Sequence, residues 1–431
     1  MGIKNRLYIK IDAKKLIFGQ LYLILYSRTL IYFVPALSIV NYFLDVINII
    51  LLFFLIGRLV KRPITSELHF FTGFILFLLL FDIICFLLEG KNLILFLWGV
   101  RNQYRFIIFF LASLFFLKKN DLPAMFTIFY RCFIINMFAV TLEFAAGYRN
   151  DFLGGTFGLE HNCNGIINVF LCIMTSYAIL GWLYKSVKKN KSMIVLIGSI
   201  YWSTLAELKI FFIELIIIFI IVMLIVKIKR TRKIFCFFII SFVLFMGIGI
   251  LTFVYPDQID YLLKNGLLGY LRDVNLGIHG FGRLSAIPIT TKVFFENSIK
   301  RILVGIGTGN AEFMMVGKIN ILSEFYKLYS DYAYNCYLYA FIYIERGILG
   351  LIWYAILFSK SILYACKYRK KMLNDRLWFD LAICTTVCFF VMCIYDSSLR
   401  VSASGFLAFL ILGLPYINAK SYLKEVRKIN L

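Results

Sequence analysis

The chain has 431 residues, of which 61% are hydrophobic and only 16% are charged, and its mean hydropathy is +0.85. Soluble domains have roughly 45–50% apolar and about 25% charged residues, so this composition excludes a soluble enzyme and indicates a protein that crosses a membrane repeatedly. The formal net charge of +23 does not indicate nucleic-acid binding, because most of the excess Lys and Arg lies in short clusters between apolar runs.

Those basic clusters set the expected orientation of the chain. Cytoplasmic loops of membrane proteins concentrate Lys and Arg, so we expect every cluster on the cytoplasmic side. The clusters lie at the N-terminus, at 58–63, 118–121, 185–191, 227–233 and 367–376, and in the C-terminal tail.

Between the clusters we expect twelve membrane spans, with both termini in the cytoplasm. In chain order the spans lie near 16–40, 42–58, 68–88, 92–117, 123–145, 163–184, 193–207, 209–226, 234–254, 336–358, 377–395 and 401–418. The remaining long segment, 255–335, has eight Lys and Arg against seven Asp and Glu, and is expected outside the cytoplasm. The sequence thus predicts an all-α polytopic membrane protein with three parts: nine spans over 1–254, an extracytoplasmic loop over 255–335, and three spans with a cytoplasmic tail over 336–431.

The ten cysteines lie mainly within apolar runs and show no CxxC or ligand-like spacing. We interpret them as small buried apolar residues and predict no disulfide framework and no metal site. A bridge between Cys163 and Cys336 is conceivable, because both are expected near the outer face.

Charges interrupt one apolar stretch, WSTLAELKIFFIE, over 202–214. Because basic clusters flank it on both sides, the 35-residue segment 192–226 must cross outward and return. At ~1.5 Å per residue it spans ~52 Å, against ~60 Å for two straight crossings of a ~30 Å core. We therefore expect a short hairpin whose turn places Glu207 and Lys209 in a pocket open to the outside. An internally paired Glu–Lys at a solvated turn is the alternative.

Arginines lie within several predicted spans. Arg101 and Arg105 are four residues apart and therefore share one face of the fourth span. Intramembrane arginines indicate function by default, and the planar guanidinium suits phosphate binding. Arg346 lies midway along the tenth span, and for Arg28 and Arg131 extension of the side chain to the membrane surface is an equal alternative.

Three stretches are expected on the outer face. GGTFGLEHNCNG, over 154–165, is glycine-rich and offers Glu160 and His161 as titratable groups, although a simple turn entering a helix explains it equally well. GIHGFGRLSAIP, over 277–288, places Arg283 after two glycines. RILVGIGTGNAEF, over 301–313, contains GxGxG, but no strand–helix unit surrounds it, so we reject a nucleotide site.

Taken in order, these stretches resemble the bacterial O-antigen and capsule repeat-unit polymerases, which share a superfamily with the O-antigen ligases. The resemblance rests on GGTFG, the AELK turn, FGRLSAI, GIGTGN and YNCYLYAFIYIERGILGLIWY, across roughly residues 95 to 358. A His-Asn pair that precedes a Glu-x-Gly-x-x-Gly helix in that superfamily is replaced here by Cys336 and Tyr337. This departure counts against the ligase branch.

The resemblance implies a glycosyltransferase C-like fold and an enzyme of the bacterial cytoplasmic membrane. It would polymerise polyprenyl-diphosphate-linked oligosaccharide repeat units into O-antigen or capsule at the outer face, by an inverting, metal-independent transfer without cofactors. The implied partners are the lipid-linked oligosaccharide and membrane lipid, together with a flippase and a chain-length regulator, and no nucleic acid.

Such a reaction needs cations for the leaving diphosphate and one general base for the acceptor hydroxyl. For the diphosphate, we predict Arg101, Arg105, Lys209 and Arg283. For the base, we predict Glu207, Glu160 or His161, with Asp273 and His279 as further candidates. Two other functions remain open: a flippase for lipid-linked oligosaccharide, and an O-antigen ligase-type transferase. The long outer loop argues against the repeated halves typical of transporters.

Overall fold

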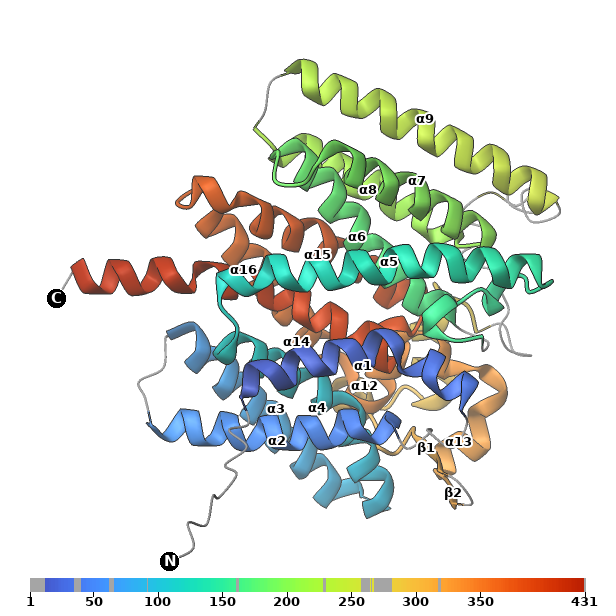
Figure 1. Cartoon of the computed structure of the whole chain (residues 1–431). Helices are drawn as coiled ribbons and strands as arrows, with labels where there is room; N and C mark the ends of the chain where they lie inside the picture. The colour runs from blue at the N-terminus through green and yellow to red at the C-terminus, as the bar shows by residue number, and fades with distance from the viewer. Residues whose placement is uncertain are drawn as a thin grey trace, which may run out of the picture.

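The computed structural model describes residues 12–34, 40–61, 66–90, 92–159, 163–227, 230–256, 264, 266, 281–316 and 319–429. Long helices lying side by side make up most of it (Figure 1). They are α1 (Ala13–Phe33), α2 (Val40–Lys61), α3 (Ser66–Glu89), α4 (Leu93–Phe116), α5 (Leu122–Ala145), α6 (Cys163–Leu183), α7 (Lys189–Leu205), α8 (Lys209–Ile225), α9 (Arg230–Val254), α14 (Leu338–Arg369), α15 (Arg376–Tyr395) and α16 (Ser402–Ile429). Shorter elements are α11 (Ala286–Ile289), α12 (Ile299–Val304), β1 (Phe313–Val316), β2 (Ile319–Leu322), α13 (Glu324–Tyr329) and several single turns.

The predicted polytopic all-α class is confirmed. In the described part of the chain, nine helices are long and apolar enough to cross a membrane, namely α1 to α6 and α14 to α16. The other three predicted spans correspond to α7 and α8, with 17 residues each, and to α9, with 25. Helices α6 and α16 are buried over most of their length and form the centre of the bundle.

The described parts of the basic segments gather at one end of the bundle (Figure 1). There, Lys119 forms an ion pair with Asp375 at 2.7 Å, and Arg369 donates to the carbonyl oxygen of Ile225, the last residue of α8. Because α7 and α8 form a hairpin that returns to this end, their connecting turn lies at the opposite end, together with the β1–β2 hairpin (Figure 1).

The described part of the predicted outer loop has a structure of its own. Strands β1 and β2 pair antiparallel, with Phe313 opposite Leu322. Aromatic side chains, among them Phe294, Tyr334 and Phe341, form a second apolar core between this segment and the N-terminal part of α14. The segment is therefore anchored to the bundle by burial of large rings, which is a strongly favourable contribution.

Helix α14 is broken at Gly347, whose backbone has φ 61° and ψ −155°. At such a break, carbonyl groups lose their helical partners and must bond elsewhere within the membrane. The carbonyl oxygens of Ile344 and Glu345 accept from the backbone N–H groups of Ile306 and Gly307, both at 2.9 Å. The GIGTGN stretch, residues 305–310, therefore supplies the hydrogen-bond donors that the broken helix needs, and we call it the GIGTGN strap.

Candidate functional site at one end of the bundle

A pocket of about 350 Å³ opens at the end of the bundle opposite the basic segments. It lies among the turn after α5, the start of α6, the α7–α8 turn, the Arg283 segment and the connection between α15 and α16. We call it the Arg283 pocket. Its charged lining residues are Asp151, Glu207, Lys209, Arg283 and Asp396, and its polar ones include Asn164, Asn168 and Ser398.

Glu207 lies in the turn between α7 and α8, and Lys209 is the first residue of α8. This is the position that the length of the segment 192–226 predicts. The Lys209 Nζ lies 3.0 Å from Glu207 Oε1, so the two side chains form an ion pair with each other. Both also line the pocket. Glu207 adopts a left-handed backbone conformation with φ 55°. For a residue with a side chain this conformation costs roughly 1–2 kcal/mol, which the turn has to offset. The turn thus holds both side chains in a fixed place.

Arg283 is held rigidly in the pocket wall. Its Nε donates to the carbonyl oxygen of Tyr395 at 3.0 Å, and its guanidinium lies 4.1 Å from the centre of the Tyr395 ring. Its own carbonyl oxygen accepts from the Tyr339 hydroxyl. Since the Nε bond and the ring fix the plane of the guanidinium, its direction in the pocket is set before any ligand binds.

Arg101 and Arg105 do not line the Arg283 pocket. The Nε and Nη2 of Arg101 both donate to Asp45 of α2, at 3.0 and 2.6 Å. A carboxylate of the protein itself therefore already binds two of the guanidinium donors of Arg101. The Nη2 of Arg105 donates at 3.4 Å to the carbonyl oxygen of Arg400, the last residue of the turn that begins at Ser398. Their role in diphosphate binding stays a prediction, and the structure brings only Lys209 and Arg283 together.

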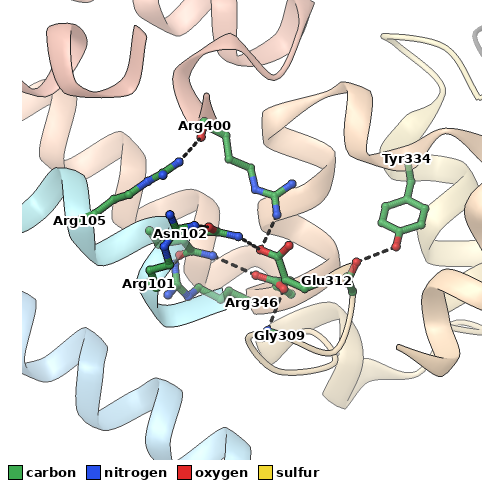
Figure 2. Close-up of polar contacts among 11 residues, drawn as sticks. Arg101, Asn102, Arg105, Gly309, Glu312, Tyr334, Arg346 and Arg400 are labelled. Carbon is green, nitrogen blue, oxygen red and sulfur yellow. Dashed lines mark hydrogen bonds and ion pairs between the residues drawn. The ribbon is translucent and has the colours of Figure 1, made fainter. Parts of the chain in front are cut away.

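Beside the pocket lies a network of buried charges (Figure 2). Glu312 accepts from Asn102 at 3.2 Å and from Arg400, which also lies 3.5 Å above the Phe341 ring. Tyr334 donates to the carbonyl oxygen of Ala311 next to it (Figure 2). This part of the network ties α4 and the loop segment to the turn before α16.

Deeper in the bundle, Arg346 binds Asp82 through two nitrogens and also donates to Gln103. Gln103 donates to Glu345 at 2.9 Å, and Glu345 accepts from the backbone N–H of Gly309 at 2.8 Å. These charges bond to one another and leave little capacity for a ligand. Their geometry indicates a structural role for Arg346, which the sequence marked as functional.

The other glycine-rich stretch, GGTFG, packs against protein. The N–H of Thr156 donates to Asn136 Oδ1 at 2.7 Å, and the N–H of Gly155 donates to Glu143 at 3.0 Å. A Cβ at Gly155 would lie 2.1 Å from Asn136 Oδ1, so the small residue permits the close contact. The simple-turn interpretation therefore accounts for the described part of this stretch.

Four predicted candidates lie outside the described residues: Glu160, His161, Asp273 and His279. Sequence inspection also missed residues that line the pocket, namely Asp151, Asn164, Asn168 and Asp396. Asp396 directly follows a predicted span in CIYDSS, and a carboxylate at the edge of a membrane helix is the signal that could have identified it.

The described cysteines are all free thiols, so the conceivable bridge between Cys163 and Cys336 is absent. The Cys163 thiol instead lies 3.1 Å from the carbonyl oxygen of Gly158. Among the described residues, no group of three or more His, Cys, Asp or Glu side chains is placed to hold a metal ion. Comparisons of this chain with protein-family models, curated proteins and solved structures found no match.

Proposed function

We propose that this protein is a membrane glycosyltransferase that lengthens a surface glycan. It would move the glycan from a polyprenyl-diphosphate carrier to a hydroxyl group of a second lipid-linked repeat unit. The observation that carries the proposal is the Arg283 pocket, which Lys209 and Arg283 line together with three carboxylates at the end of an apolar helix bundle.

Two fixed cations suit the leaving group of this reaction. As the glycosyl–oxygen bond breaks, the departing lipid diphosphate gains negative charge, and donors already in place stabilise that charge without reorganising. Arg283 offers a planar fork held by Tyr395, and Lys209 offers a compact charge held in the α7–α8 turn. Apolar lining residues, among them Leu208, Ile210 and Val401, suit the first isoprene units of the carrier.

The positions of the basic segments support an outward-facing pocket. Lys and Arg concentrate in cytoplasmic loops, and the basic segments meet at the end of the bundle opposite the pocket. In this orientation the enzyme would act at the outer face of the bacterial cytoplasmic membrane, where it would meet lipid-linked repeat units delivered by a flippase.

A flippase remains the second candidate, because the break in α14 is a feature that transporters share. In transporters, unwound backbone typically leaves carbonyl groups open to an ion or a substrate. Here, Ile306 and Gly307 already occupy the two carbonyl groups at the break. That occupancy favours the transferase over the flippase.

The test is reconstitution of the purified protein in vesicles with a synthetic polyprenyl-diphosphate repeat unit, with EDTA present and the products separated on a gel. A ladder of chain lengths supports the polymerase. Movement of the lipid across the bilayer without a ladder would replace it by the flippase. A single transfer to lipid A-core, added as a second acceptor, would indicate a ligase.

The first variant for this assay is Arg283→Ala. Loss of one preorganised donor to a developing charge typically costs about 10²–10³ in turnover, and we expect a loss of this size with normal protein levels in the membrane. Arg283→Lys should recover little of the lost turnover, because an ammonium group cannot reproduce the planar set of guanidinium donors. Wild-type turnover in Arg283→Ala would remove this residue from the mechanism. Arg101→Ala and Arg105→Ala, assayed beside it, test the two predicted cations that do not line the pocket.

A further inference from the structure

Three carboxylates line the Arg283 pocket, and their partners differ. Asp151 accepts a hydrogen bond from the Asn164 side chain, and Glu207 forms an ion pair with Lys209 at 3.0 Å. Among the residues that the structure describes, no cation forms an ion pair with the third carboxylate, Asp396. A carboxylate paired with an ammonium is a weaker proton acceptor, because the neighbouring positive charge favours the ionised form.

The position of Asp396 is fixed from several sides. Its backbone N–H donates to Met392 at the end of α15, and its carbonyl oxygen accepts from Leu338 at the start of α14, both at 3.0 Å. Its Oδ1 accepts from the backbone N–H of Ser398 at 2.8 Å. These bonds hold the carboxylate against the pocket and use one of its two oxygens.

The second oxygen of Asp396 lies beside Gly165, close to the start of α6. A Cβ at Gly165 would lie 3.6 Å from Asp396 Oδ2 and 2.7 Å from the Cβ of Ser398, so a larger residue would crowd this corner. Gly165, Asp396 and Ser398 all line the pocket. Because Asp396 is half-buried and lines the pocket, a hydroxyl group bound there could reach its carboxylate.

The surroundings of Asp396 make it a stronger base than a solvated aspartate. Burial raises the pKa of Asp396, while hydrogen bonding by Ser398 and the charge of Arg283 lower it in part. Because a proton acceptor works best when its pKa approaches the working pH, this direction suits the role.

We propose that Asp396 is the catalytic base that accepts the proton of the acceptor hydroxyl. The assignment rests on the proposed glycosyl transfer. The acceptor oxygen attacks the anomeric carbon as its proton passes to Asp396 Oδ2. The bond between that carbon and the phosphate oxygen breaks, and its electron pair leaves with the lipid diphosphate at Arg283 and Lys209. This assignment places the base on Asp396 in preference to Glu207.

The assignment predicts an acid limb in the pH profile. Asp396 must be ionised to accept a proton, and its folded pKa is raised, so turnover should fall as the pH drops through a value above the usual ~3.9 of aspartate. The titratable and charged groups that face it from other elements are Asp151, Glu207, Lys209, Glu214, Arg283 and Cys336, with Tyr337 beside them. On its own element they are Cys393 and Tyr395.

The experiment compares Asp396→Asn with two other amide variants in the reconstituted ladder assay. Asp396→Asn should lose about 10²–10⁴ of turnover while still binding radiolabelled polyprenyl diphosphate. It should also lose the acid limb. Glu207→Gln should keep the acid limb and instead change the concentration of donor that gives half-maximal rate, because it frees Lys209. Asp375→Asn makes the same chemical change at the basic end of the bundle and should stay within about twofold of wild type.

The results distinguish a failure of the proposed function from a failure of the role assigned to Asp396. No ladder from the wild-type protein overturns the proposed function and the role of Asp396 with it. A wild-type ladder with full turnover in Asp396→Asn, or loss of the acid limb in Glu207→Gln, overturns the role of Asp396 alone. If Asp396→Asn does not accumulate in the membrane, Asp396→Glu decides: it should retain an acid limb with a shifted midpoint, and an unshifted midpoint rejects the assignment.

Discussion

Two arginine–aspartate pairs in this bundle have the same chemistry and different surroundings. The Arg346 and Asp82 side chains are only 2% and 0% exposed, whereas those of Arg101 and Asp45 are 28% and 20% exposed. A charge that loses its partner costs more stability the more deeply it is buried within the protein. The buried pair should therefore dominate stability, although both look alike in the sequence.

Asp82→Ala should be strongly destabilising. Asp82 accepts from Arg346, from the Tyr104 hydroxyl and from Thr308, the latter two at 2.8 Å. Its removal leaves a buried guanidinium without its carboxylate, with Gln103 as a neutral acceptor, and two hydroxyl groups without this acceptor. We expect a loss of about 3–5 kcal/mol in the free energy of unfolding.

The matched control for this change is Asp45→Ala, which should cost clearly less, because the Arg101 side chain that it leaves without Asp45 is 28% exposed. Thermal unfolding of both purified variants in the same detergent measures the difference. Equal shifts of the midpoint temperature would show that burial does not separate the two pairs.

At the scale of single residues, the sequence identified charges but not their partners. Arg101 and Arg105 share a helix face as predicted, yet Asp45 lies 56 residues away in the chain, and no local pattern shows that it occupies the Arg101 fork. Asp396 was missed for a related reason. A single carboxylate between two apolar segments becomes significant only when the α7–α8 turn and the Arg283 segment are folded beside it.

At the scale of elements, length and charge predicted the α7–α8 hairpin, because too few residues connect two basic clusters for two full crossings. The same reasoning could not predict the break in α14. After Glu345 and Arg346, apolar residues continue the span together with Gly347 and Gly350, and glycines within an apolar run are compatible with an unbroken membrane helix. The break depends on the GIGTGN strap, which is distant in sequence.

Gly347→Ala should prevent the strap from docking. Gly347 has φ 61°, and a Cβ there would lie 2.4 Å from the backbone carbonyl carbon of Leu303, so the substitution adds a clash to a backbone conformation that disfavours alanine. We expect little folded protein in the membrane, measured by fluorescence-detected size-exclusion chromatography.

Gly73→Ala is the matched control within α3. A Cβ at Gly73 would meet no atom within 4 Å, and alanine is a better helix former than glycine, so folded yield should be unchanged or higher. Normal yield of both variants would mean that α14 does not require its break.

At the scale of the whole molecule, the fold separates its charges along the bundle axis. Basic segments meet at one end, and the Arg283 pocket opens at the other, beneath a loop segment with its own aromatic core. The apolar lengths and the basic clusters were sufficient to predict this division. They could not predict the β1–β2 hairpin or the second core, because the loop segment has neither long apolar runs nor a clear period.

The orientation of this axis can be tested with two exposed leucines. Leu328 lies in α13 of the loop segment with 72% of its surface exposed, and Leu373 follows α14 at the basic end with 61% exposed. If the basic end is cytoplasmic, a membrane-impermeant maleimide should label Leu328→Cys in intact cells and Leu373→Cys only after permeabilisation. The unsubstituted protein measures labelling of the native cysteines. The opposite pattern would place the Arg283 pocket in the cytoplasm and exclude glycan polymerisation at the outer face.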